Sequence, residues 1–149
     1  MMDHEYYMRR ALDLAREAAR RGEVPVGCVI VSAAGEIVGQ GRNRRRETRS
    51  ALSHAETEAI GMACRALGDW RLDGCTLFVT LEPCPMCAGA IIMSRISAVV
   101  YGAREEQSGS CASILNLFAE SYPSRPAVYG GVLAAESAAL LSAFFEKLR

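Results

Sequence analysis

Three residues in two short segments have the types and spacing of metal ligands. His54 begins a His-Ala-Glu segment, and Cys84 and Cys87 are separated by two residues in a Pro-Cys-Pro-Met-Cys segment. Two thiolates and one neutral imidazole suit Zn²⁺ and fill three of its four tetrahedral positions. The fourth position then stays open for water, which distinguishes a catalytic zinc site from a structural one. We therefore predict a catalytic centre with one Zn²⁺ per chain.

The acidic residue of the first segment, Glu56, can carry protons at such a centre. A zinc ion lowers the pKa of its bound water toward ~7. Glu56 can take the proton of that water and pass it to a ring nitrogen and then to a departing amine. The two segments together are typical of zinc enzymes that replace the exocyclic amine of a nucleobase with oxygen. The sequence therefore predicts hydrolytic deamination, with Glu56 as the catalytic residue.

A closed structural zinc site and a redox dithiol are the alternatives for these cysteines. A closed site needs a fourth ligand, and the other cysteines are Cys28, Cys64, Cys75 and Cys111. None of these lies at a second short ligand spacing, so we expect buried thiols instead. A redox pair would leave His54 and Glu56 without a role.

Length and composition indicate one globular domain over residues 1–149. Lysine and arginine together number 17, as do aspartate and glutamate, so the net charge of zero carries no global signal for nucleic acid. The N-terminal segment has no secretory pattern, and no apolar run approaches the ~18 residues that span a bilayer. We expect a cytoplasmic protein without a membrane partner, in which the six cysteines stay reduced.

Hydrophobic periodicity predicts strands alternating with helices. We expect strands at residues 24–31, 36–41, 75–81, 97–101 and 127–129. We expect helices at residues 3–20, 54–67, 85–94 and 111–118, and a last one with Leu140, Leu141, Phe144, Phe145 and Leu148 on one face. Residues 42–53 and 107–113 are expected to be loops, and Ser53 is the expected N-cap of the second helix. The alternation predicts an α/β fold, and a hairpin formed by the first two strands makes the sheet mixed.

The chain resembles the bacterial tRNA-specific adenosine deaminases, within the cytidine deaminase-like superfamily. The resemblance extends over nearly the whole length. Its motifs are Gly-Glu-Val-Pro-Val-Gly at 22–27, Asn43, His-Ala-Glu at 54–56, the segment 79–91 around the two cysteines, Val-Val-Tyr-Gly-Ala at 99–103 and Gly-Val-Leu at 131–133.

This resemblance implies a three-layer fold, with a five-stranded mixed sheet between helices, and a homodimer. It implies that Asn43 contacts the target base or its ribose and that Val26 helps to line the pocket. The implied substrate is adenosine at the wobble position of a tRNA anticodon, which is converted to inosine. Local alternatives remain, because Asn43 suits a turn and Val26 suits a strand in the core.

Three segments differ from the usual family pattern. Ser50–Ser53 stand where the family has Asp-Pro-Thr, Glu105 replaces an aspartate, and residues 122–124 replace an Asn-His pair. These differences keep open a deaminase of a free base or nucleoside, such as guanine, cytosine or cytidine. A zinc-stabilised RNA-binding module without activity is a third possibility. Cys28 stands where the family usually has alanine, and the sequence supplies no physical reason for it.

A basic cluster favours RNA. Its members are Arg42, Arg44, Arg45, Arg46 and Arg49. Arginine binds phosphate through two hydrogen bonds and stacks on bases, so the cluster could hold an anticodon loop. A solvated loop kept soluble by its charge is the alternative.

Overall fold

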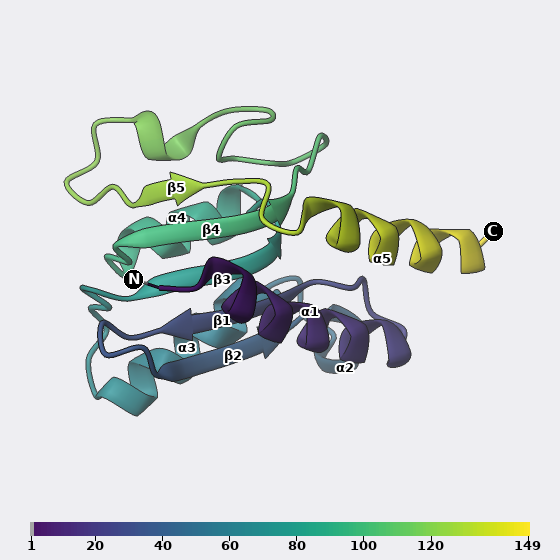
Figure 1. Ribbon diagram of the computed structural model, residues 1–149, viewed down its shortest axis with the longest axis horizontal. Coiled ribbons are helices and arrows are strands. Elements are labelled where there is room, and N and C mark those ends of the chain that lie inside the picture. The colour runs from purple at the N-terminus through teal and green to yellow at the C-terminus, as the bar shows by residue number, and fades with distance from the viewer. Residues whose placement is uncertain (1) are drawn as a thin grey trace.

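A five-stranded mixed sheet forms the middle layer of the protein (Figure 1). The computed structural model describes residues 2–149. The strands are β1 (Gly27–Val31), β2 (Ile37–Arg42), β3 (Thr76–Leu81), β4 (Ala98–Ala103) and β5 (Ala127–Tyr129), in the spatial order β2-β1-β3-β4-β5. Strand β1 is antiparallel to both of its neighbours, whereas β3, β4 and β5 are parallel. The predicted mixed sheet is confirmed.

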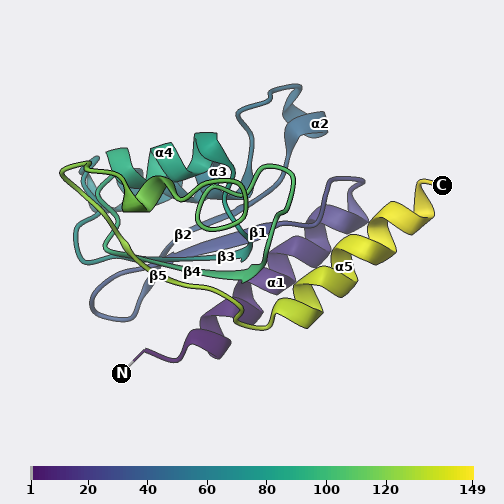
Figure 2. The same ribbon diagram turned by 90° about the horizontal axis from the view of Figure 1, so that it is seen from above.

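Helices cover both faces of this sheet, which makes three layers (Figure 2). Helices α1 (His4–Arg20) and α5 (Ala134–Lys147) lie on one face, and α3 (Ala55–Leu67) and α4 (Pro85–Met93) lie on the other. The one-turn helix α2 (Arg45–Thr48) stands away from the sheet. Within residues 2–149, no helix combines the length and the apolar character needed to cross a membrane.

Strand β1, which lies between β2 and β3, is buried on both faces because each face is covered by a helical layer. Cys28 and Ile30 pack in the core beneath α3 and α4, and Val29 and Val31 pack in the core beneath α1. This burial explains why the strand is a continuous apolar run in the sequence. It begins only at Gly27, because Pro25 has no N–H to donate to a ladder and the amide of Val26 donates to the carbonyl oxygen of Val24.

Two glycines of β2 allow α3 to lie directly on the sheet. A Cβ atom at Gly41 would stand 2.2 Å from the carbonyl oxygen of Ala55, and one at Gly39 would stand 2.4 Å from that of Ala59. Neither position has room for a side chain, so the small residues of strand and helix set the distance between them. The same contact fixes the N-terminus of α3, where His54 stands.

The structure differs from the sequence prediction in two loops. The segment 42–53 contains α2, which the sequence analysis treated as loop. The predicted helix at 111–118 is wrong, since the segment forms turns followed by a single 3₁₀ turn at Leu117–Ala119. The amide of Ile114 donates to the carbonyl oxygen of Gly109, and the amide of Leu117 donates to that of Ser110. These bonds span five and seven residues, whereas an α-helix requires bonds that span four.

The C-terminal helix α5 extends beyond the edge of the sheet (Figure 1). Its predicted apolar face is therefore only partly covered. Leu140 packs against the core under α1, whereas Phe145 and Leu148 are exposed.

Candidate metal centre and pocket

The three predicted metal ligands meet at the N-termini of two neighbouring helices. His54 is the N-cap of α3, in place of the expected Ser53, and its backbone N–H donates to Thr57 Oγ1 at 3.1 Å. Cys84 is the N-cap of α4, and Pro85 follows at the first helical position, where a missing N–H costs nothing. Cys87 lies one turn further along α4. Each ligand is thereby mounted on a rigid element.

The spacing of the donor atoms fits a tetrahedral zinc ion. His54 Nδ1 lies 3.7 Å from Cys84 Sγ and 3.4 Å from Cys87 Sγ. Zn–S and Zn–N bonds of ordinary length at tetrahedral angles separate sulfur from nitrogen by about 3.5 Å. In the described part of the chain, no ligand atom of a fourth His, Cys, Asp or Glu joins this group. The donor set is therefore that of an open, three-ligand site.

The two thiols differ sharply in acidity. A hydrogen bond from Cys87 lowers the pKa of Cys84 to about 4, and the same contact raises the pKa of Cys87. The pKa of Cys84 is thus shifted toward the thiolate form, which is the form that binds a metal. A ready thiolate beside an imidazole favours capture of a soft divalent cation.

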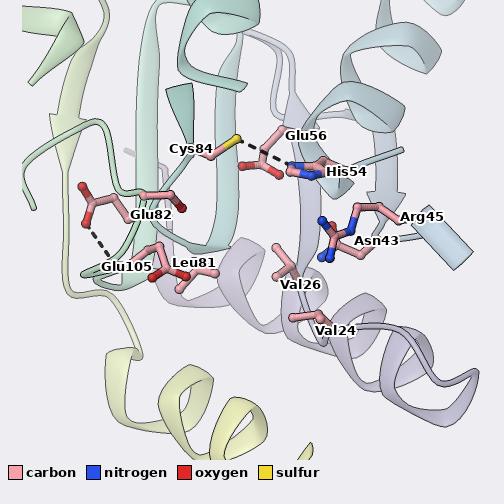
Figure 3. Close-up of a pocket in the computed structure, with 11 residues that line it drawn as sticks. Val24, Val26, Asn43, Arg45, His54, Glu56, Leu81, Glu82, Cys84 and Glu105 are labelled. Carbon is pink, nitrogen blue, oxygen red and sulfur yellow. Dashed lines mark hydrogen bonds between the residues drawn. The ribbon is translucent and has the colours of Figure 1, made fainter. Parts of the chain in front are cut away.

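The carboxylate of Glu56 lies beside the metal ligands in the first turn of α3 (Figure 3). The residue is 3% exposed, and this burial raises the pKa of Glu56 to about 7. A carboxyl group with a pKa near neutrality can both accept and donate a proton under ordinary conditions.

A cavity of ≈ 140 Å³ opens on this centre. It is lined by Val24, Val26, Asn43, Arg45, His54, Glu56, Leu81, Glu82, Cys84, Glu105 and Ser108. Both predicted substrate contacts, Val26 and Asn43, therefore lie in the wall of the same cavity as Glu56 (Figure 3). Val24 and Ser108 were not predicted as site residues, because a valine in a strand motif and a serine in a loop carry no signal of a site by residue type.

Glu82 is a second buried carboxylate, and it holds the loop that forms one wall of the cavity. It is 2% exposed, and its oxygens accept from the amides of residues 105, 111, 112 and 113 and from the hydroxyl of Ser113. Burial by itself raises the pKa of Glu82, but these hydrogen bonds outweigh it and the pKa is lowered. The loop brings Glu105 (Figure 3) to the cavity, and Ser108 of the same loop also lines it. Glu82 could have been noticed in the sequence, because it is an acidic residue directly after an apolar strand.

The arginines of the basic cluster have different environments. Arg42 and Arg44 both pair with Glu47, at 3.2 Å and 2.6 Å. Arg45 lies in the wall of the cavity, and its side chain points inward (Figure 3). Arg44 also pairs with Glu58 of α3 at 3.7 Å, so Arg42 and Arg44 each have a carboxylate partner, whereas Arg45 faces the cavity.

The remaining cysteines are not ligands. All six are free thiols, and the four outside the centre are Cys28, Cys64, Cys75 and Cys111. Burial raises the pKa of each of these four, so they are neutral at physiological pH. Cys28 is fully enclosed in the core beneath α3, where it fills space as a small apolar side chain.

Known proteins resemble this chain in sequence and in fold. Residues 1–103 match the cytidine and deoxycytidylate deaminase zinc-binding region. The tRNA-specific adenosine deaminase of Bacillus subtilis (strain 168) is 45% identical over 150 residues, which cover 100% of this chain and 92% of that protein. A structure solved in studies of A-to-I editing by tRNA:A34 deaminases at the wobble position of transfer RNA has a TM-score of 0.88 and 43% identity, covering 91% of this chain and 99% of that one. The structure of guanine deaminase from Bacillus subtilis has a TM-score of 0.66 and 34% identity, and the match covers 97% of this chain and 95% of that one. The chain therefore belongs to the zinc-binding cytidine and deoxycytidylate deaminase family, in the branch that includes the tRNA-specific adenosine deaminases.

Proposed function

We propose that this chain is a zinc-dependent hydrolase that converts adenosine to inosine at the wobble position of a tRNA anticodon. The observation that carries the proposal is the position of the Glu56 carboxylate, which faces the same cavity as the three-ligand centre and Asn43. Relatives at 43–45% identity over nearly the full chain are named tRNA-specific adenosine deaminases, which supports adenosine in RNA as the substrate.

Each residue of the centre has a distinct part in this proposal. His54, Cys84 and Cys87 hold zinc, which when bound supplies a Lewis acid that lets water ionise near neutral pH. Glu56 takes a proton from the attacking water and delivers it to a ring nitrogen of the base. It then takes the remaining proton of the new hydroxyl group, which becomes the carbonyl oxygen, and passes this proton to the departing amine. The product is an oxygen in place of the exocyclic nitrogen, with release of ammonia.

The cavity supports a single unstacked base as the group that reacts. Val24, Val26 and Leu81 supply apolar surface for the faces of a purine ring, and Asn43 supplies a polar group at its edge. Anticodon loops present unstacked bases, which proteins that act on RNA take into such pockets.

The substrate is tested by offering purified protein an anticodon stem-loop with adenosine at the wobble position. A stem-loop with adenosine one position later serves as the matched control, beside a panel of adenosine, guanine, cytosine and cytidine. We expect inosine only in the first RNA. Ammonia from a free base alone would contradict the proposal, and guanine is the critical member because a 34% identical structure is a guanine deaminase.

A homodimer is the proposed assembly. Large apolar side chains are exposed on and around the layer of α3 and α4, with Met93 73%, Leu52 66% and Met62 42% exposed. Exposed apolar surface of this kind is typical of protein interfaces. Light scattering on the purified protein should give twice the chain mass, and Met93→Glu should shift it toward the monomer. A wild-type mass of one chain would contradict this assembly.

The cytoplasm is the proposed location. Six free cysteines suit a reducing compartment, and a tRNA substrate requires the compartment in which tRNA matures. Fractionation of cells that express the chain at its natural level should recover it with the ribosome-free cytoplasmic fraction. Recovery in an oxidising compartment would contradict this location.

A further inference from the structure

The one-turn helix α2 is capped by a residue from a distant part of the chain. Its own N-cap, Arg44, makes no side-chain capping bond. Instead Oε1 of Glu23 accepts from the amide of Arg46 at 3.2 Å, and Oε2 accepts from the amide of Glu47 at 2.8 Å. Both oxygens of one carboxylate therefore bind the free N–H groups at the start of α2, as a capping side chain does.

Polar contacts are what hold this helix, since α2 buries none of its residues. Apolar packing cannot fix its orientation, and four residues are far too few for a helix to persist alone. Glu23 is 3% exposed, so its position is set by the core around it. Thr48 Oγ1 adds a 2.6 Å bond to Ser53 Oγ at the other end of the segment. The buried carboxylate is thus the rigid point to which α2 is attached.

The first residue of α2 is Arg45, whose side chain points into the cavity beside Asn43 (Figure 3). Its neighbours Arg42 and Arg44 share the carboxylate of Glu47. Arg45 itself is exposed at the mouth of the cavity, where a guanidinium can reach a ligand that is only partly enclosed.

We propose that Arg45 binds a backbone phosphate adjoining the target nucleotide and that Glu23 is the positioning residue that aims it. This deepens the proposed function and rests on it, because a base inside the cavity leaves its sugar and phosphates at the mouth. A planar guanidinium matches two phosphate oxygens with paired hydrogen bonds. Glu23 contacts no substrate and acts only through the backbone of α2.

The test compares Arg45→Ala, Glu23→Gln and the double variant on the wobble-adenosine stem-loop. Glutamine keeps one acceptor oxygen but points an NH₂ group at an amide donor, so it should loosen α2 without leaving a hole. Both single variants should raise KM about tenfold with kcat unchanged. A tenfold change in KM is the effect expected from the loss of one charge-assisted hydrogen bond. Arg45→Ala should also lower the slope of log KM against log salt by about 0.7, the value for one phosphate of a single strand.

The double variant separates positioning from general destabilisation. If Glu23 acts through Arg45, then Glu23→Gln adds no further rise in KM to Arg45→Ala. Equal effects of Glu23→Gln in both backgrounds would overturn the positioning role. Arg46→Ala is the matched control, since Arg46 follows on the same helix but does not line the cavity. A KM rise in this control equal to that of Arg45→Ala would overturn the assignment to Arg45.

A substrate-independent measurement distinguishes this proposal from the proposed function. Amide hydrogen exchange at Arg46 and Glu47 should be slow in the wild type and faster in Glu23→Gln, whatever the substrate is. Unchanged protection would overturn the attachment of α2 by Glu23. If the wild type does not act on the stem-loop, the proposed function fails and the phosphate role of Arg45 fails with it, while the exchange result still decides the attachment.

Discussion

The side-chain Oδ1 of Asn43 accepts a hydrogen bond from the backbone N–H of Ala55 at 2.9 Å. Ala55 is the first residue of α3 and lies between His54 and Glu56. One end of the Asn43 side chain is therefore used to hold the helix of the metal centre, and the Nδ2 end is the donor that remains for a ligand. This bond joins residues twelve positions apart, so it is not the local turn contact that the sequence left open, and it is compatible with the predicted substrate role.

This division predicts different outcomes for two substitutions of Asn43. Asn43→Asp keeps the acceptor for Ala55 but loses the NH₂ donor, so KM should rise while the free energy of unfolding changes little. Asn43→Ala loses both functions and should also destabilise the protein by about 0.5–2 kcal/mol, as removal of a cap does. Urea unfolding and steady-state kinetics measure the two effects. An equal loss of stability in both variants would show that the acceptor is not what matters.

Glu56→Gln should abolish turnover without disturbing the metal centre. Glutamine fills the same buried space but cannot carry a proton, so kcat should fall by about 10²–10⁴. Zinc content by mass spectrometry and the far-UV circular dichroism spectrum should match the wild type. Glu58→Gln is the control on the same helix, since Glu58 lies outside the cavity and pairs with Arg44. Full activity of Glu56→Gln in ammonia release would refute the mechanism and favour a zinc-stabilised module without activity.

Removal of the metal should weaken the connection between α3 and α4. The ligands lie at the N-termini of the two helices, so an ion that joins them stabilises only the folded state. We expect a chelator to lower both Tm and activity, and added Zn²⁺ to restore both. Cys87→Ser should behave as the chelated protein, whereas Cys64→Ser should bind zinc normally. A Tm that is independent of metal in the wild type would contradict a resident ion.

Gly41→Ala should be among the more damaging single-methyl substitutions. The new Cβ would meet the carbonyl oxygen of Ala55 at 2.2 Å, so strand or helix must move. Overpacking of this kind costs about 1–3 kcal/mol, and here it also displaces the end of α3 that carries Glu56. Gly61→Ala is the control, because its Cβ meets only the tip of the Arg65 side chain at 3.4 Å. That substitution should stabilise the helix by about 0.5–1 kcal/mol, and calorimetry of both variants checks the contrast.

The metal centre could be predicted from the sequence because its determinants are local. Cys84 and Cys87 are one helical turn apart, and His54 and Glu56 share the first turn of α3. The strands were also predictable, since burial on both faces leaves continuous apolar runs such as β1. The predicted bounds of the strands differ from the observed ones by a few residues where a proline or a turn interrupts the apolar run.

The supports of the pocket could not be predicted in the same way. Glu23 and Glu82 bind amides that lie more than twenty residues further along the chain, and no periodicity records such a contact. Helix α2 carries charged residues without an apolar face, so it has the pattern of a loop. The segment 111–118 has the opposite property, because its apolar residues suggest a helix but its amides are bound to Glu82.

The carboxylates of Glu23 and Glu82 contact their loops almost entirely through backbone N–H groups, which every residue except proline possesses. Side chains at positions 45, 105 and 108 can therefore be substituted while the backbone of both loops and the metal centre keep their structure. Substitutions that change the substrate, whether natural or in a directed-evolution library, are therefore expected at these cavity-lining positions. The unusual residues at Ser50–Ser53 and Glu105 lie in these adaptable segments.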